Sequence, residues 1–317
     1  SGCNLFKEFL NEQGFSQFRM IPFRIHLRRQ LALLKFFESQ FKVAQPSVLV
    51  TEYDRYNESA CLVLASKRFQ IPSITQVHGL LNFRMSYTPL ISERVGCWGG
   101  WQKKTLMNWN VPEENILITG ATQMNFQSMD SIPGSLSIPW LREGKKIVIL
   151  ATNPISDIRQ RLVEIFCKTM NLLGSDFVGV IRTHPSEKPS DYEQYISSPN
   201  VFLPEDEDTQ NWVFKNCFAV TTYNSAFAID ALLHEKPVFQ IQLDKARKSA
   251  LNQLEEMKVV DSCQDELELS RKISRARQSI YEQEFKEYQD TAYHITMRSP
   301  IEINNFQGFL DDLYGNY

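Results

Sequence analysis

Two histidines, His78 and His184, stand directly after apolar β-branched runs. The first follows residues 71–77 and precedes Gly79, and the second lies in the segment Arg182-Thr183-His184-Pro185. An imidazole titrates near neutral pH and can move a proton, and a guanidinium binds phosphate oxygens in pairs. The pair of Arg182 and His184 therefore suits the departure of a nucleotide phosphate. The alternative for His184 is a loop histidine bonded to backbone.

His78 is the candidate base on the other side of the reaction. A general base that titrates near neutral pH can deprotonate an acceptor hydroxyl, and Gly79 leaves room for a substrate to approach. Asp54 is a second candidate for this catalytic step, and Glu52 and Glu58 are candidate acceptor-binding carboxylates, because all three follow the run 47–51. Each of these carboxylates fits a solvated loop charge equally well.

A nucleotide donor needs groups that bind phosphate and ribose. The segment Thr222-Tyr223-Asn224-Ser225 follows an apolar run and opens a predicted helix that carries Asp230. A helix amino terminus offers N–H groups to an anion, and a carboxylate one to two turns later suits ribose hydroxyls. Thr152 and Asn153 follow the apolar run 146–150 and suit phosphate in the same way. The alternative for Asn224 and Ser225 is a helix cap.

The pattern along the chain predicts the elements that position these residues. Short β-branched runs alternate with helical apolar spacing, which predicts βαβ units and parallel sheets. The alternation stops at a loop rich in Ser, Pro and Gly and restarts at Ile147. We expect an acceptor domain over 1–135, a nucleotide-donor domain over 145–280, and helices over 281–317 that pack back toward the first domain. In such sheets ligands bind beyond the carboxyl ends of the strands.

Composition narrows the classes of function. The 317 residues carry 34 basic and 37 acidic side chains, a net charge of −3, which gives no global electrostatic case for nucleic-acid binding. Six scattered cysteines without a CxxC pair argue against a zinc site and for a reducing compartment, and we expect a cytoplasmic protein. A basic segment with leucines over 24–35 fits peripheral contact with the inner membrane face, or a packed helix with one solvated side.

Four segments together resemble the GT-B transferases of bacterial surface polysaccharides. Residues 71–79 resemble their "GIP…QHG" segment, 98–120 their "wG…GvP…vtG" segment, 182–185 their "KxHP", and 221–238 their "TDYSS…DA…GKP". The set is similar to CDP-glycerol glycerophosphotransferases and to capsule or lipopolysaccharide transferases of the Kdo or sialic-acid type. It departs from them at Val77, at Thr222 and Asn224, and at His234-Glu235. The first half also has fewer strands than the family, as expected of a trimmed or reduced domain, or of one domain of a larger protein.

The resemblance implies an α/β protein of the GT-B type, with two Rossmann-like domains facing across a cleft. It implies a nucleotide-sugar donor, with CMP or CDP favoured over UDP or GDP, and a glycan or lipid-linked glycan acceptor. The resemblance also implies no metal and no cofactor, with the nucleotide-activated donor as a substrate. Two rivals remain: a nucleotide-sugar 2-epimerase on a similar fold, and a non-catalytic GT-B domain that binds a nucleotide.

Overall fold

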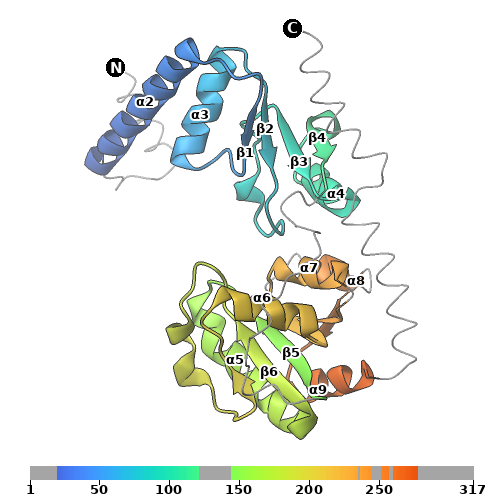
Figure 1. The fold of residues 1–317 in the computed structure, drawn as a ribbon. Coiled ribbons are helices and arrows are strands. Elements are labelled where there is room, and N and C mark those ends of the chain that lie inside the picture. The colour runs from blue at the N-terminus through green and yellow to red at the C-terminus, as the bar shows by residue number, and fades with distance from the viewer. Residues whose placement is uncertain (1–19, 121–143, 235, 244–250, 257–259, 278–317) are drawn as a thin grey trace.

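The computed structural model describes residues 20–120, 144–234, 236–243, 251–256 and 260–277. The expected helices over 281–317 lie outside these residues. Of the expected boundary at 135–145, only residues 144 and 145 are described. The strands form two separate sheets, one before and one after the boundary (Figure 1). Among the described helices, none combines the length and the apolar character that a membrane crossing requires.

The first sheet has four parallel strands in chain order. They are β1 (Leu49–Thr51), β2 (Ser73–Gln76), β3 (Arg94–Cys97) and β4 (Ile116–Ile118). The helices of this half are α2 (Met20–Val43), α3 (Asn57–Arg68) and α4 (Gly100–Asn108), with short 3-10 turns η1 (Arg84–Ser86) and η2 (Glu113–Asn115). The basic segment near the start of the chain belongs to α2, which packs along α3 (Figure 1).

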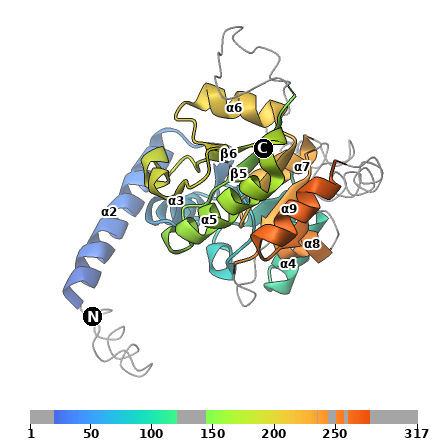
Figure 2. The ribbon, with the colours of Figure 1, turned by 90° about the horizontal axis from the view of Figure 1, so that it is seen from below.

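The second sheet has six parallel strands in the order β10-β9-β8-β5-β6-β7. They are β5 (Lys146–Ala151), β6 (Phe177–Arg182), β7 (Val201–Phe202), β8 (Ala219–Thr222), β9 (Val238–Ile241) and β10 (Asp261–Cys263). Its helices are α5 (Ser156–Leu173), α6 (Glu207–Asn216), α7 (Phe227–Leu233), α8 (Leu251–Glu256) and α9 (Glu266–Arg275). In Figure 2, α5 and α9 lie side by side on one face and α6 lies on the other. The sheet is thus covered on both faces, as parallel sheets require.

The core of the second half explains the apolar runs in the sequence. Strand β5 is buried from Ile147 to Ala151, because helices cover both of its faces. Gly179 on β6 allows α5 to approach closely, since a Cβ there would lie 2.8 Å from Cγ of Met170. A larger residue would push α5 off the sheet. Strand β10 was not expected from the sequence, which predicts only helix after Leu251, whereas helix α9 agrees with that prediction.

The two halves meet at the carboxyl ends of their strands. Trp98 and Trp101, which follow β3, are buried in the same cluster as the core of the second sheet. Nδ2 of Asn224 donates a hydrogen bond to Oδ1 of Asn82 at 2.9 Å, and these residues follow β8 and β2. The segments that carry the candidate residues are therefore neighbours in space.

Candidate active site

The second sheet reverses its strand order between β5 and β8, and the predicted donor residues lie at this point. Asn153 follows β5, and its Nδ2 donates to the carbonyl of Asn224 at 2.9 Å. The N–H of Asn224 donates back to Oδ1 of Asn153 at 3.2 Å. Such switch points are where parallel sheets bind ligands. The structure brings Thr152, Asn153 and Asn224 together as the sequence predicts.

The start of α7 differs from the expected anion site. Helix α7 begins at Phe227 rather than near Ser225. The N–H of Ser225 donates to Oγ1 of Thr222 at 3.2 Å, and that of Phe227 donates to Oγ of Ser225 at 3.3 Å. The predicted helix start near Ser225 therefore lies two residues later, and the N–H groups of residues 224, 225 and 227 are bonded within the protein. Thr222 and Ser225 cap the turn instead, with Oγ1 of Thr222 also donating to the carbonyl of Ala151.

His184 is held in one tautomer by its own loop. The N–H of Ser186 donates to Nδ1 of His184 at 3.2 Å, so Nδ1 accepts and Nε2 carries the proton. Burial lowers the pKa of His184; Glu187 opposes this shift and Arg182 adds to it. The backbone N–H of His184 donates to Oγ1 of Thr152 at 2.9 Å. The result is a neutral imidazole with an Nε2–H donor.

Glu187 organises this loop, and sequence reasoning missed it. Its side chain is 3% exposed. It accepts from Oγ1 of Thr152 at 2.6 Å, from Nη2 of Arg159 at 3.2 Å and from the hydroxyl of Tyr192. Thr152 thus links Glu187 to the backbone of His184. The place of Glu187 three residues after His184 does not reveal this role, because its partners Thr152 and Arg159 belong to other segments of the chain.

Arg182 and Asp230 lie together at the edge of this group. The guanidinium of Arg182 stands 4.2 Å from the centre of the Phe227 ring. Burial raises the pKa of Asp230, while the charges of His234 and Arg182 oppose that rise. Asp230 lies three residues after Phe227 on α7, so it belongs to the same part of the site as Arg182.

His78 sits in a cluster of tyrosines on the first half. The hydroxyl of Tyr53 lies 2.8 Å from Nε2 of His78, and the hydroxyl of Tyr87 lies 3.3 Å from Nδ1. Burial lowers the pKa of His78, and the negative charge of Glu52 opposes this. Burial also raises the pKa values of both tyrosines, which keeps them protonated. The tyrosines are partners that the sequence reasoning did not identify.

The loop that carries His78 is fixed by backbone contacts. Nε1 of Trp98 donates to the carbonyl of Val77 at 2.9 Å, and Nε2 of Gln102 donates to the carbonyl of Gly79 at 3.0 Å. A Cβ at Gly79 would meet no atom within 4 Å. The space beside Gly79 is thus open, in keeping with the expected approach of a substrate.

One of the predicted acceptor-binding carboxylates, Glu58, does not reach this region. Glu58 lies exposed on α3, where it pairs with Arg29 of α2 at 3.5 Å. The expectation that Glu58 binds an acceptor is therefore not supported, because its helix turns it toward α2. Glu52 is exposed, and its charge acts on His78. Among the described residues, no group of three or more His, Cys, Asp or Glu could hold a metal ion.

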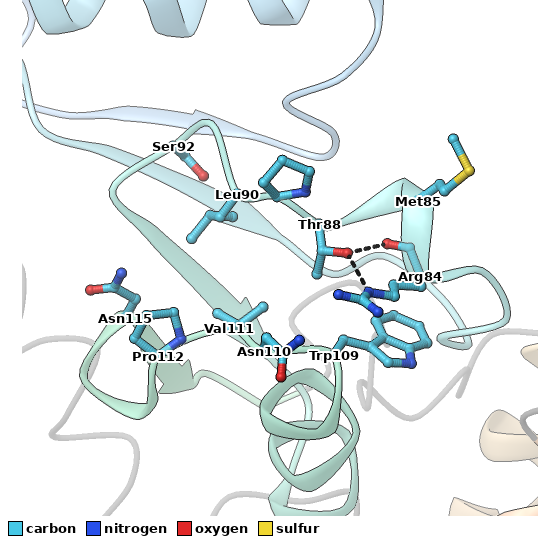
Figure 3. Close-up of a pocket in the computed structure, with 11 residues that line it drawn as sticks. Arg84, Met85, Thr88, Leu90, Ser92, Trp109, Asn110, Val111, Pro112 and Asn115 are labelled. Carbon is cyan, nitrogen blue, oxygen red and sulfur yellow. Dashed lines mark hydrogen bonds between the residues drawn. The ribbon is translucent and has the colours of Figure 1, made fainter. Parts of the chain in front are cut away.

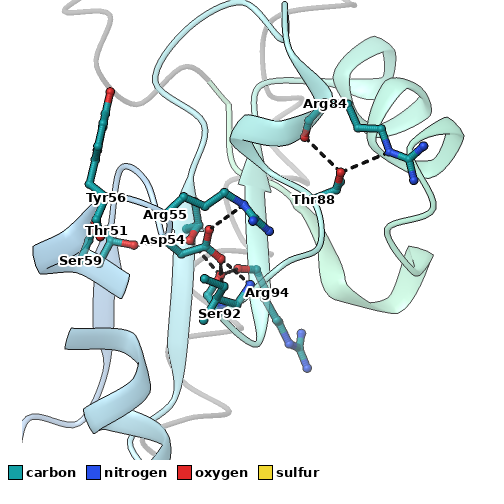
Figure 4. A network of polar contacts seen from close by, with 11 residues as sticks. Thr51, Asp54, Arg55, Tyr56, Ser59, Arg84, Thr88, Ser92 and Arg94 are labelled. Carbon is teal, nitrogen blue, oxygen red and sulfur yellow. Dashed lines mark hydrogen bonds and ion pairs between the residues drawn. The ribbon is translucent and has the colours of Figure 1, made fainter. Parts of the chain in front are cut away.

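Asp54 is fully buried and structural (Figure 4). Its Oδ2 accepts from the N–H groups of Ile91 at 2.6 Å and of Ser92 at 2.9 Å, and from the hydroxyl of Ser92 at 3.3 Å. Oδ1 lies 3.8 Å from Nε of Arg55. A carboxylate that clamps a loop in this way is out of reach of an acceptor hydroxyl. The geometry therefore replaces the expected role of Asp54 as a base with a structural one.

We expect Asp54→Ala to lower the free energy of unfolding by about 3 kcal/mol, because two backbone N–H groups lose a charged acceptor. Activity per folded molecule should be retained. Urea unfolding and an assay on the folded fraction check this. Glu52→Ala, an exposed neighbour, should change stability by less than about 0.5 kcal/mol. A stable Asp54→Ala protein that has lost its activity would restore Asp54 as a base.

Comparison with known proteins reveals the fold but no close relative. No family of known sequences matches the chain, and no curated protein matches it. Among solved structures, S. aureus MnaA with UDP is 13% identical, covering 92% of this chain and 82% of its own, with a TM-score of 0.63. The chain has the GT-B fold. A UDP-GlcNAc 2-epimerase from Neisseria meningitidis, bound to UDP-GlcNAc, is also 13% identical, covering 91% of this chain and 81% of its own, with a TM-score of 0.58.

Glycosyltransferases share the same GT-B fold. The glycosyltransferase from Rickettsia africae is 12% identical, covering 98% of this chain and 88% of its own, with a TM-score of 0.60. The GT-B fold therefore occurs in both of the enzyme classes that the sequence leaves as rivals. The chemistry of the site is therefore needed to distinguish a glycosyltransferase from a 2-epimerase.

Proposed function

We propose that this protein is a metal-independent glycosyltransferase that moves a sugar, or a polyol phosphate, from a nucleotide donor to a glycan acceptor. The observation that carries the proposal is the neutral His184 with its Nε2–H, whose backbone N–H is bonded to Thr152, the residue before Asn153, where the strand order reverses. Donor phosphates at a switch point place the leaving group next to this donor proton. The acceptor would lie on the opposite side, at His78.

The chemistry follows from the two histidines. As the bond between the transferred group and the nucleotide phosphate breaks, negative charge grows on the phosphate. The Nε2–H of His184 stabilises that charge, with the guanidinium of Arg182 nearby. His78 accepts the proton of the acceptor hydroxyl, because its lowered pKa keeps it neutral. The Tyr53 hydroxyl lies 2.8 Å from this Nε2, so the acceptor hydroxyl must replace it for His78 to take the proton.

The carboxylates favour a transferase over a 2-epimerase. An epimerase needs carboxylates and histidines that converge on one sugar and no acceptor. Here Asp54 clamps a loop and Glu58 pairs with α2, while Glu52 is the predicted carboxylate whose charge acts on His78. The immediate partners of the His78 ring are two tyrosines. This surrounding suits a base for a hydroxyl acceptor better than the epimerisation of a bound sugar.

The deciding experiment separates donor binding, transfer and epimerisation. Thermal melts with CMP, CDP, UDP and GDP identify the base, because a ligand at 100 times its Kd adds about 2.7 kcal/mol. The sequence resemblance favours the cytidine nucleotides, whereas two of the similar structures hold UDP or UDP-GlcNAc. The matching nucleotide sugar is then incubated with and without a glycan acceptor. Transfer only with acceptor supports the proposal. A 2-epimer from donor alone, or binding without turnover, overturns it.

We expect Asp230→Asn to raise the KM for the donor about tenfold and to leave the KM for the acceptor unchanged. A ribose that loses a charged acceptor loses roughly 1.5 kcal/mol, which corresponds to about that factor. Initial rates at varied donor and acceptor measure both constants. If Asp230 only pairs with Arg182, both constants should stay the same.

The acceptor and the location of the enzyme belong to the same proposal. We infer a lipid-linked or capsule-type glycan and a cytoplasmic enzyme that contacts the membrane through α2. The helix exposes Ile25, Leu31 and Phe36 together with Arg28 and Arg29. Sedimentation with vesicles of anionic lipid tests this contact, with vesicles of neutral lipid as the control.

A further inference from the structure

A pocket of about 510 Å³ opens on the first half, and its lining residues are not among the candidate active-site residues (Figure 3). One wall is the loop over residues 84–92, and the other is the segment over residues 109–115. These segments lead into the starts of β3 and β4, so the pocket lies at the amino edge of the sheet. His78 follows the end of β2, at the opposite edge. The volume lies in the range of pockets that bind small molecules.

The lining has one charge and one large aromatic ring. Arg84 is its single cation, and no carboxylate lines the pocket. Trp109 contributes the half-buried indole, and Asn110 and Asn115 contribute two amides. Figure 3 shows Arg84 and Trp109 together at one end and Asn115 at the other, with Asn110 between them. The pocket therefore combines an anion-binding end, an apolar face and an amide end.

The groups are held in place before any ligand arrives. Nε of Arg84 donates to Oγ1 of Thr88 at 3.3 Å, and this hydroxyl donates back to the carbonyl of Arg84 at 3.0 Å. These two hydrogen bonds between Arg84 and Thr88 hold the Arg84 side chain in place. Trp109 packs against the buried cluster of the first half, which fixes its ring. Asn110 follows with a positive φ of 66° and its N–H bonded to the carbonyl of Met107. Preorganised groups lose little entropy on binding.

We propose that this pocket binds a sugar acid, a pyranose ring that carries a carboxylate. The guanidinium pairs with the carboxylate, the indole covers the C–H face of the ring, and the two amides bind hydroxyls. A free inorganic anion would use Arg84 alone and leave the indole and the amides unused. A nucleotide would bring several phosphate charges to one cation. The proposal concerns binding at this edge and does not rest on the proposed transferase activity.

The test compares two sugars that differ in the carboxylate. Binding of D-glucuronate and D-glucose is measured by saturation-transfer NMR and titration calorimetry on the whole protein, with inorganic phosphate as a third probe. We expect glucuronate to bind at least tenfold more tightly than glucose or phosphate. Arg84→Gln should reduce glucuronate binding to the level of glucose. Arg161→Gln, an exposed arginine of α5 that pairs with Glu164, should bind like the unchanged protein.

Several results would overturn the proposal. These are no binding of glucuronate, equal binding of glucuronate and phosphate, or full binding by Arg84→Gln. Arg84→Lys keeps the charge and loses the paired geometry, so it should fall between the unchanged protein and Arg84→Gln. Thermal melts confirm that each variant is folded, and Arg84 is exposed, so its replacement leaves the core intact.

Discussion

His184→Ala is expected to lower turnover by about 10²- to 10⁴-fold while the protein stays folded. The Nε2–H of His184 is the proton donor that the proposed mechanism places at the leaving phosphate, and its tautomer is set by the N–H of Ser186. Alanine removes that donor and leaves Thr152 bonded to the backbone N–H of residue 184. Release of the nucleotide from the donor, followed at saturating donor and acceptor, measures the loss.

Stability and a second histidine provide the controls for this prediction. His26→Ala, an exposed histidine on α2, should keep full turnover. Burial lowers the pKa of His184 below 6.5, so the folded protein binds this proton less readily than the unfolded chain. The free energy of unfolding should therefore decrease as pH falls below about 6.5. In His184→Ala this decrease should be smaller than in the unchanged protein. A variant that melts early and keeps its specific activity would show that His184 is only structural.

Glu187→Ala is expected to lower the free energy of unfolding by about 3 kcal/mol, as large an effect as that expected for Asp54→Ala. Removing this buried carboxylate leaves Arg159, whose side chain is 18% exposed, without its closest anion. It also takes an acceptor from Thr152 and Tyr192. Glu187→Gln keeps an oxygen acceptor and the side-chain volume, so its free energy of unfolding should fall by less than that of Glu187→Ala. Urea unfolding at constant pH gives both values.

A double-mutant cycle separates the ion pair from the rest of this network. Arg159→Ala and the double variant with Glu187→Ala should show a coupling energy of more than about 1 kcal/mol. Glu164→Ala breaks an exposed pair with Arg161 on the same helix and should cost less than about 0.5 kcal/mol. Additive effects of Glu187→Ala and Arg159→Ala would contradict the role given to Glu187. Because Thr152 joins Glu187 to His184, turnover should fall together with stability in Glu187→Ala.

The sequence predicts these strands well because a strand that is buried on both faces is a continuous run of apolar residues. The runs at 146–150 and 177–181 are strands β5 and β6 almost residue for residue. The residues that follow parallel strands meet at one edge of the sheet, so the pattern of strands is enough to predict that Asn153, His184 and Asn224 lie near one another. Strand β10 escaped prediction because Asp261–Cys263 is a short polar segment whose strand form depends on pairing with β9.

The direction of a side chain is what the sequence does not contain. Asp54 follows a strand, as a catalytic carboxylate would, but it turns inward to the N–H groups of Ile91 and Ser92, 37 and 38 positions away. Tyr53 and Tyr87 reach His78 from other loops, and Glu187 meets partners from α5 and from the end of β5. These contacts arise only when the loops pack on each other. The order of residues along the chain therefore does not reveal these contacts.

The strand order of the two sheets has a consequence for how the chain folds during synthesis. In the first sheet each strand pairs with the one made just before it, so β1 to β4 can assemble as they leave the ribosome. In the second sheet β5 is central, and its other neighbour, β8, arrives much later: Oγ1 of Thr221 bonds the carbonyl of Ile149, 72 positions apart. Until then one edge of an apolar strand is without its partner. Pairing over such separations is slow, so aggregation during expression should start from β5 and β6 rather than from the first sheet.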